Sequence, residues 1–183
     1  MNLTLYPGRP ADETGRLPKE RRSYDLLDAL GVSYQRADHP PADTMEACAA
    51  ASEALQVTIC KNLFLCNRQK TAFYLLAMPH DKPFKTKELS GQLGISRLSF
   101  AGAEEMARYL DVTPGSVSVL GLANDTDRAV RLLLDADLKG EAYFACHPCI
   151  NTSSVKFATA DLLEKILPAV GHEPTWVTLS GQQ

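Results

Sequence analysis

Short apolar segments of two different periods alternate along this chain, and this alternation most limits its possible folds. Some segments have apolar side chains at every third or fourth residue, which is typical of a helix packed on a core, and others are short continuous apolar runs, which are typical of buried strands. Glycine, proline and Asn-Asp turns separate the segments, and no unit repeats. The chain is therefore predicted to be a mixed α/β (α+β) protein.

The predicted elements cover most of the chain. Helices are expected at residues 18–30, 44–55, 86–93, 103–110 and 159–170, and strands at 32–37, 61–66, 71–78, 97–100, 117–122, 129–135, 142–145 and 176–179. Gly31 and Gly94 end two of the helices, and Asp43 or Thr44 caps a third. Residues 1–17, which are rich in proline, glycine and charge, are expected to form an N-terminal arm, and residues 18–183 a single domain.

Composition limits the class and compartment of the protein. The 183 residues are 45% hydrophobic and 22% charged, which is ordinary for a globular chain. No apolar run approaches the length that spans a bilayer, and the first residues lack the regions of a signal peptide. Five cysteines, an odd number, suit reduced thiols better than a disulfide framework. We expect a cytoplasmic protein without a membrane partner.

A lysine begins one of the apolar strands, in Cys60-Lys61-Asn62-Leu63-Phe64-Leu65-Cys66. An ammonium group with apolar neighbours loses hydration unless an anion or a polarised oxygen compensates for it. Lys61 is therefore either an ordinary solvated lysine or a ligand for a phosphate or a carbonyl oxygen.

Positive charge is concentrated in one segment of an acidic chain. The total formal charge is −3, whereas residues 60–97 carry seven basic and two acidic side chains and so a net charge of +5. A local basic patch suits a small phosphate footprint, such as one end of a tRNA, rather than a DNA duplex. The alternative is a solvated face of a lysine-bearing helix.

Two loops carry backbone or side-chain chemistry. In Thr113-Pro114-Gly115-Ser116-Val117-Ser118 the glycine allows a tight turn and a close backbone approach to a ligand, whose developing negative charge exposed amides stabilise. In Cys146-His147-Pro148-Cys149-Ile150-Asn151-Thr152 the histidine either selects a substrate or bonds a core carbonyl.

Cysteine chemistry gives two further hypotheses. A zinc site would combine Cys146, His147 and Cys149 with Cys60 or Cys66. Cys-x-x-Cys can support zinc, but the second pair has the wrong spacing for a zinc ribbon, and Pro148 restricts the loop. A cysteine nucleophile would pair one of these thiols with His147, although nothing in the sequence marks a thiol as activated. We expect no metal and no cofactor.

Six motifs occur in one order: Lys61-Asn62-Leu63-Phe64-Leu65, Arg97-Leu98-Ser99-Phe100, Pro114-Gly115-Ser116-Val117-Ser118, Asn124-Asp125-Thr126, His147-Pro148-x-x-Asn151-Thr152 and Gly171-His172-Glu173-Pro174. Together, over about residues 23–179, they resemble the YbaK/aminoacyl-tRNA synthetase-associated deacylase family, and most of all its free-standing prolyl-tRNA editing branch. The resemblance implies a compact domain with a curved, barrel-like mixed sheet flanked by helices.

The resemblance also implies hydrolysis of mischarged aminoacyl-tRNA, with Ala-tRNA(Pro) as the expected substrate. A pocket sized for proline cannot strongly exclude alanine, so a second pocket that admits only alanine completes the selection. The implied catalytic residues are Lys61, Gly115 and Ser116, with water as the nucleophile. The implied substrate-binding residues are Met45, Asn62, Val117, His147 and Asn151. The implied tRNA-binding residues are Lys82, Lys85, Lys87 and Arg97.

The implied partner is the acceptor end of aminoacyl-tRNA, with prolyl-tRNA synthetase or an elongation factor as transient partners. Two positions depart from the family pattern: Val119 replaces a proline four residues after the loop glycine, and Cys66 replaces a basic residue. They leave hydrolysis in place but open the choice of substrate to cysteine or serine on a non-cognate tRNA. A non-catalytic tRNA-binding or regulatory module of the same fold is the other alternative.

Overall fold

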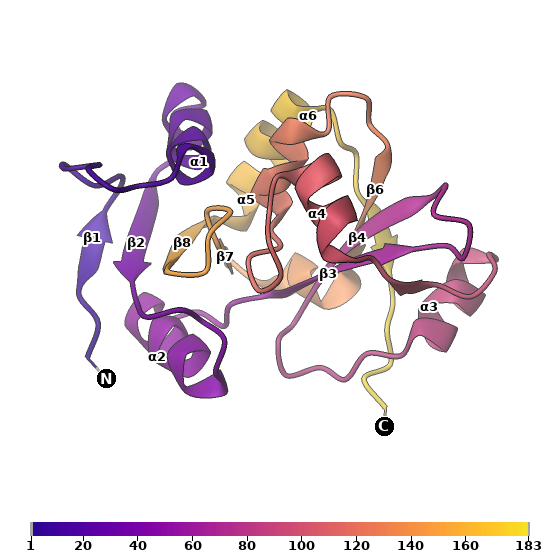
Figure 1. Ribbon diagram of the computed structural model, residues 1–183. Coiled ribbons are helices and arrows are strands. Elements are labelled where there is room, and N and C mark those ends of the chain that lie inside the picture. Colours follow the sequence, from indigo (N-terminus) through magenta and orange to yellow (C-terminus); the bar gives the residue numbers. More distant parts are fainter. Residues whose placement is uncertain (1, 183) are drawn as a thin grey trace.

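The computed structural model describes residues 2–182, apart from the side chain of Met45. Its elements are β1 (Leu5–Pro7), α1 (Pro18–Ala29), β2 (Tyr34–Asp38), α2 (Met45–Leu55), β3 (Lys61–Cys66), β4 (Phe73–Met78), α3 (Thr86–Leu93), β5 (Ser99–Phe100), α4 (Ala103–Leu110), a 3₁₀ helix η1 (Val119–Asn124), β6 (Val130–Asp135), a 3₁₀ helix η2 (Ala136–Gly140), β7 (Tyr143–Cys146), β8 (Ser153–Ala158), α5 (Thr159–Asp161), a π-helical turn η3 (Leu162–Ile166), α6 (Leu167–Val170) and β9 (Thr175–Val177). Figure 1 shows their arrangement.

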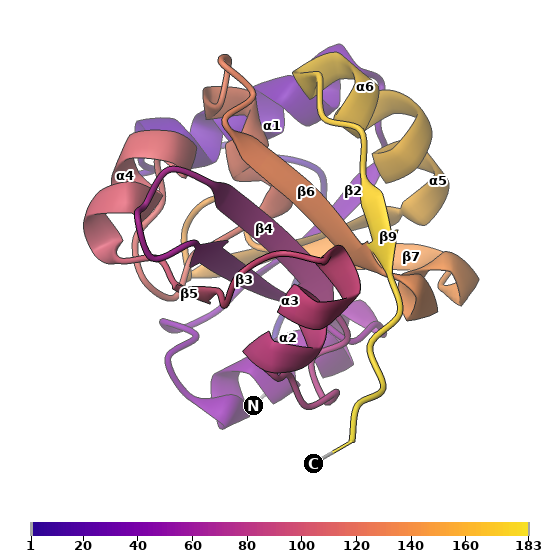
Figure 2. The same ribbon diagram turned by 90° about the vertical axis from the view of Figure 1, so that its right-hand side faces the viewer.

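The strands form two sheets (Figures 1 and 2). One is antiparallel in the order β1-β2-β8-β7, and the other is mixed in the order β5-β3-β4-β6-β9. In the mixed sheet β3 runs antiparallel to β4 and β5, whereas β6 runs parallel to β4 and β9. The predicted α/β class is confirmed, but the two sheets do not close into a barrel.

Both faces of the mixed sheet are covered, which explains the continuous apolar runs in its strands. Alternate residues of β3 and β4, such as Phe64 and Leu75, face the larger core, which also contains residues of α1 and of the antiparallel sheet. The intervening residues, such as Leu65 and Leu76, face a second core beneath α3. Figure 2 shows α3 in front of this second face. Within residues 2–182, no helix combines the length and apolarity that a membrane crossing requires.

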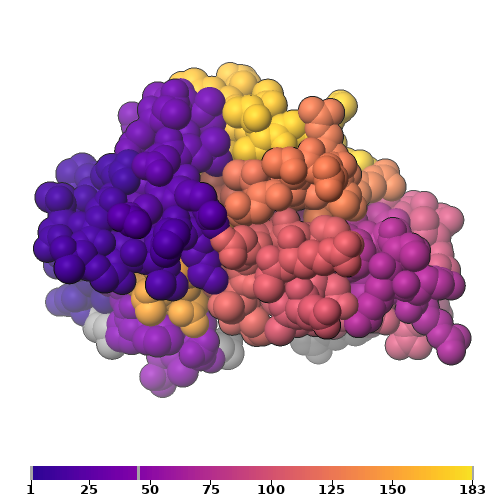
Figure 3. Space-filling view, turned by 45° about the horizontal axis from the view of Figure 1, so that its top comes forward, coloured from indigo at the N-terminus to yellow at the C-terminus, as the bar shows by residue number. Residues whose placement is uncertain are grey.

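Residues near the N-terminus pack on the antiparallel sheet and on α1. Leu5 of β1 pairs with Ala37 of β2. Arg9 lies 2.8 Å from a carboxylate oxygen of Asp25, and Arg16 lies 2.8 Å from one of Asp38. Figure 3 shows these indigo residues beside the coral segment that follows α4. The first residues of the chain thus contribute an edge strand and several ion pairs.

Most predicted elements are confirmed to within a few residues, and one is wrong. Residues 117–122 were expected to form a strand, but the 3₁₀ helix η1 occupies most of them. The Ser118 hydroxyl accepts a hydrogen bond from the Leu120 amide, 3.2 Å away, and starts this helix. Gly121 then approaches Leu110 so closely that a Cβ atom would lie 2.8 Å from its carbonyl oxygen. Strands β1 and β8 were not predicted.

Candidate active site

A pocket of about 170 Å³ lies where loops from both sheets meet. Five of the predicted site residues line it, and these are Lys61, Asn62, Gly115, Val117 and His147. The sequence interpretation missed four other lining residues, Ala42, Cys48, Ile59 and His80, and it considered Cys60, which also lines the pocket, only as a zinc ligand or a nucleophile. Residues separated by up to 105 positions in the chain therefore share one small cavity.

Lys61 enters this pocket from the first position of β3. Its side chain is half-buried, and its ammonium group donates a hydrogen bond to the carbonyl oxygen of Lys82. Burial lowers the pKa of Lys61 from its ordinary value, against an opposing contribution from Asp81. A partly desolvated cation with a carbonyl partner retains donors for an anionic or polarised oxygen.

Asn62 lines the pocket and has a buried, unpaired acceptor. Its Nδ2 donates to the Cys60 carbonyl oxygen over 3.1 Å. Its buried Oδ1 finds no hydrogen-bond partner among the described residues. Leaving a buried acceptor unpaired costs about 1–3 kcal/mol, so a bound ligand is a physical reason for keeping one there.

The turn at residues 113–116 holds Gly115 against the pocket. Gly115 has φ +87°, and a Cβ atom there would lie 3.3 Å from Asp43 Oδ1 and 3.6 Å from Asn151 Nδ2. Asn151 Nδ2 itself donates to Asp43 Oδ1 over 2.9 Å. The glycine conformation and the Asp43–Asn151 bond thus bring two loops together, and Asn151 supports the pocket without lining it.

Ser116 fixes the turn from inside. Its hydroxyl donates to the Thr113 carbonyl oxygen over 2.9 Å and accepts from the Thr113 amide over 3.0 Å. Its own amide donates to the same carbonyl oxygen, 2.9 Å away. Both polar groups of Ser116 are therefore engaged within the turn, while Val117 faces the pocket.

His147 is half-buried in the loop between β7 and β8. Its Nδ1 lies 2.8 Å from the Ser153 carbonyl oxygen, and its ring lies 5.9 Å from that of His39 between centroids. Burial lowers the pKa of His147, a hydrogen bond to Ser153 opposes this, and His39 adds to the lowering. The imidazole is accordingly neutral at physiological pH.

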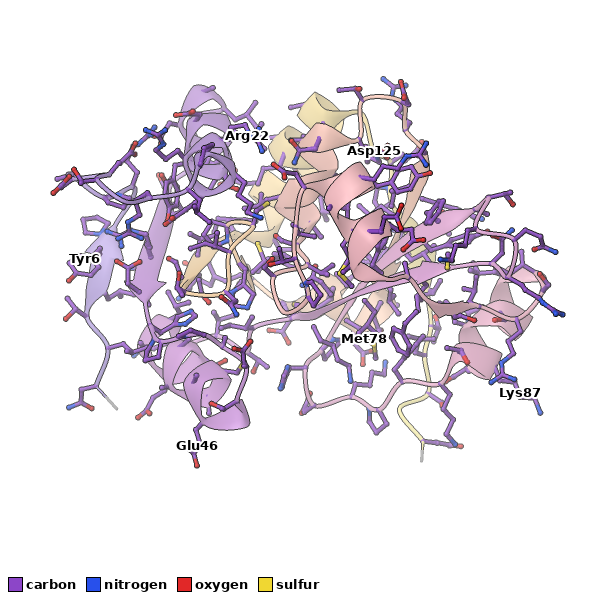
Figure 4. All side chains as sticks on the ribbon, viewed as in Figure 1. Tyr6, Arg22, Glu46, Met78, Lys87 and Asp125 are labelled. Carbon is purple, nitrogen blue, oxygen red and sulfur yellow. The ribbon has the colours of Figure 1, made fainter. Side chains whose placement is uncertain are left out.

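The predicted tRNA-binding cations separate into two groups. Lys85 just before α3, Lys87 within α3 and Arg97 before β5 are exposed, and Figure 4 shows Lys87 at the opposite end of the molecule from Tyr6. Lys82 was expected to be exposed as well, but its side chain is 11% exposed and lies 2.8 Å from Asp135 and 2.9 Å from Asp137. Two carboxylates offset its charge, so Lys82 is a structural cation.

Three more positions that the sequence analysis named are not among the residues seen to line the pocket. Met45 is the first residue of α2, after the Thr44 cap, but its side chain lies outside the described residues. Val119 and Cys66, where the chain departs from the family pattern, are both buried in the larger core.

The buried cysteines are poor nucleophiles. Burial raises the pKa of Cys60 to about 12 and that of Cys149 to about 11, and it also raises the pKa of Cys146. Each thiol therefore stays protonated at neutral pH, whereas nucleophilic attack needs the thiolate. Among the described residues, no three His, Cys, Asp or Glu side chains are grouped around a possible metal position.

Comparisons with known proteins identify the family of this chain. The family model of the aminoacyl-tRNA editing domain matches residues 39–165. The chain is 34% identical over 146 residues to the prolyl-tRNA editing protein ProX of Acetoanaerobium sticklandii, covering 80% of this chain and 88% of that protein. It is 32% identical over 152 residues to the prolyl-tRNA synthetase associated domain-containing protein 1 of Danio rerio, covering 82% of each chain.

Solved structures share the fold. One, described as a candidate trans-editing enzyme for prolyl-tRNA synthetase, has a TM-score of 0.64 at 16% identity and covers 90% of this chain and 99% of its own. Another, the hypothetical protein APE2540, has a TM-score of 0.61 at 19% identity and covers 82% of this chain and 94% of its own. The resemblance predicted from the six motifs is confirmed: the chain belongs to the aminoacyl-tRNA editing domain family and is an aminoacyl-tRNA deacylase.

Proposed function

We propose that this protein hydrolyses the ester bond of alanine wrongly attached to tRNA(Pro). The observation that carries the proposal is the pocket of about 170 Å³, which contains Lys61, the Gly115 turn and neutral His147. Typical small-molecule sites measure about 300–1,000 Å³, so this cavity suits a small aminoacyl group rather than a large one. The similarity to prolyl-tRNA editing proteins supports tRNA(Pro) as the carrier.

In the proposed reaction a water oxygen bonds to the ester carbonyl carbon, and the bond from that carbon to the ribose oxygen breaks. The proton from the water passes to the ribose oxygen, so free alanine and intact tRNA result. Lys61 holds the terminal phosphate or the ester carbonyl, and the backbone at Gly115 approaches the carbonyl oxygen where charge develops. Ser116 contributes by holding the turn, and the neighbouring ribose hydroxyl helps to place the water.

The proposed aminoacyl pocket uses Asn62, Val117 and His147, and Asn151 supports it through Asp43. Met45 stays a proposed substrate contact. A synthetase pocket built for proline discriminates only weakly against alanine, because each missing methylene is worth only about 1–3 kcal/mol. The editing pocket therefore has to exclude proline by its small size. In this second, smaller pocket the alanyl ester binds better than the prolyl ester. Replacing His147 should therefore change the ratio of alanyl to prolyl ester hydrolysis more than it changes stability.

The proposed nucleic-acid contact is the acceptor end of the tRNA, bound through phosphates by Lys85, Lys87 and Arg97. This activity belongs with protein synthesis in the cytoplasm, where prolyl-tRNA synthetase or an elongation factor would be transient partners.

The test is a panel of deacylation rates on Ala-, Cys-, Ser- and Pro-tRNA(Pro), each with and without the protein. We expect the largest kcat/KM for Ala-tRNA(Pro) and no hydrolysis of Pro-tRNA(Pro) above the rate without protein. A larger kcat/KM for the cysteinyl or seryl ester would reassign the substrate. Binding of tRNA without turnover of any ester would replace the proposal with a tRNA-binding module.

A further inference from the structure

A chain of hydrogen bonds behind the pocket connects two histidines through one serine. His39 Nδ1 lies 2.8 Å from the Pro40 carbonyl oxygen, and His39 Nε2 lies 2.8 Å from Ser154 Oγ. Ser154 Oγ lies 3.2 Å from His147 Nδ1, which also lies 2.8 Å from the Ser153 carbonyl oxygen. Both His39 and Ser154 are buried, so water does not compete for these bonds.

The carbonyl oxygens of Pro40 and Ser153, at the two ends of this hydrogen-bond network, determine which nitrogen atoms of the histidines carry protons. A carbonyl oxygen only accepts, so His39 carries its proton on Nδ1 and leaves Nε2 as the acceptor. Ser154 then donates its one proton to His39 Nε2 and offers a lone pair to His147 Nδ1. The Ser153 carbonyl oxygen also requires a proton on His147 Nδ1. Two independent partners thus select the same tautomer of His147.

In a neutral imidazole with its proton on Nδ1, the other nitrogen, Nε2, is an acceptor. His147 lines the pocket, and its Nε2 has no hydrogen-bond partner among the described residues. Asn62 lines the same pocket, and its Oδ1 is likewise an unpaired acceptor among those residues. The aminoacyl cavity therefore has one accessible unpaired acceptor, His147 Nε2, which calls for a ligand group with an N–H donor, and a second, Asn62 Oδ1, is buried beneath the lining.

We propose that His39 and Ser154 are positioning residues that hold His147 as an acceptor, so that His147 Nε2 binds the α-ammonium group of the substrate. This inference rests on the proposed function, because it assigns a role within the same pocket. An ammonium group has three N–H donors and is the one group with this chemistry that every aminoacyl ester carries. An imidazole with a proton on Nε2 would point a donor at that cation and repel it.

The tautomer is measured directly by ¹⁵N–¹H correlation spectra of the histidine rings, with His147 assigned by comparison with His147→Gln. We expect an unprotonated Nε2 and a protonated Nδ1 in the free wild-type protein. In Ser154→Ala the proton should be distributed over both nitrogens. A proton on Nε2 of the free wild-type protein would overturn the proposal, and this measurement does not depend on any deacylase activity.

The bound group is tested with a non-hydrolysable probe, 3′-(L-alanyl)amino-3′-deoxyadenosine, and with its N-acetylated form, which lacks the ammonium group. We expect the amine probe to shift the His147 Nε2 resonance and the acetylated probe to leave it in place. Equal shifts with both probes, or none with the amine probe, would contradict the ammonium assignment.

Kinetics distinguish positioning from a general loss of structure. For Ser154→Ala we expect KM for the alanyl ester to rise by about tenfold, the value of one hydrogen bond, with kcat within about twofold of wild type. The control is Ser23→Ala, which removes another buried hydroxyl, bonded to the Lys19 carbonyl oxygen 3.1 Å away, and should leave KM unchanged. A fall in kcat at constant KM in Ser154→Ala would show that the serine does not act through ammonium binding.

Discussion

Lys61 combines partial burial with a single backbone acceptor, and it can therefore be removed without leaving a charge unpaired. Lys61→Ala should lower kcat/KM by more than about 30-fold, which corresponds to about 2–3 kcal/mol of lost transition-state stabilisation. The thermal midpoint should barely move. Deacylation and thermal unfolding of the same preparation provide the measurement.

The matched control is Lys70→Ala, which removes an exposed lysine from the hairpin that follows the same strand. This variant should retain wild-type kcat/KM. A folded Lys61→Ala protein with full deacylation would remove Lys61 from the mechanism.

Gly115 combines φ +87° with the close approach of Asp43. In Gly115→Val, the left-handed conformation is strained for a β-branched residue, and the new side chain crowds the turn and the adjacent carbonyl site. Turnover should fall for every ester, without a change in preference. Gly140→Val is the control, because no atom lies within 4 Å of a Cβ there and the φ of Gly140 is not positive. A change in preference at an unchanged rate would place Gly115 in selection instead.

Asp125 and His172 connect the loop before β6 to the end of α6. His172 Nε2 lies 2.9 Å from Asp125 Oδ2, and the Asp125 carboxylate also accepts from the amides of Ala129 and Val130. Asp125→Ala removes one member of a buried, multiply bonded pair and should lower the free energy of unfolding by about 3–5 kcal/mol. Urea unfolding measures this, with exposed Asp127→Ala as the control. A loss below about 1 kcal/mol would show that the pair contributes little.

The elements that sequence predicts well have their own local signals. Thr44 caps α2 by accepting a hydrogen bond from the Ala47 amide, and Gly94 ends α3 in a left-handed conformation. The error at residues 117–122 has a physical cause, because a short apolar run fits a buried strand and a buried 3₁₀ helix equally well. Strand β1 is three residues long, and β8 begins with two buried serines that look like loop residues.

Some of the pocket residues could be predicted from the sequence, and others could not. Lys61, Gly115 and His147 belong to motifs that can be recognised in the sequence from their chemistry or from the resemblance to the family. The structure places all three in one pocket. His80 and Cys48 reach the pocket only through tertiary folding, since neither stands in a recognisable motif. The ion pairs of Lys82 depend on Asp135 and Asp137, more than fifty residues away, so charge counted along the chain could not show that Lys82 is neutralised.

At the scale of the whole molecule, the exposed basic surface is smaller than the number of lysines and arginines in residues 60–97 implies. Removing Lys85, Lys87 and Arg97 together should flatten the salt dependence of tRNA binding, with a slope reduced by up to about 2–3 for three lost phosphate contacts. The control is Lys82→Gln, which should leave the slope unchanged because Asp135 and Asp137 already offset that charge. Binding titrations over a range of salt concentrations measure both. A triple variant with the wild-type slope would show that these cations do not contact the tRNA.

The pocket also spans the two sheets. Lys61 belongs to the mixed sheet, while His147 lies in the loop between two strands of the antiparallel sheet. Neither sheet alone contains the site. The larger core, which contains residues of both sheets, therefore sets the geometry of the pocket as well as the stability of the fold.

The arrangement of the five cysteines has a consequence for thiol chemistry. Four are buried, and the fifth, Cys48, is half-buried in the wall of the pocket. An alkylating reagent therefore meets one accessible thiol in the folded protein and five in the unfolded chain. Because burial raises the pKa of Cys48, we expect that reaction to be slow and the adduct to lie in the wall of the cavity. Rapid alkylation should therefore report the fraction of unfolded protein. Slow alkylation of Cys48 should block the pocket of folded protein, and a bound substrate should protect Cys48 from the reagent.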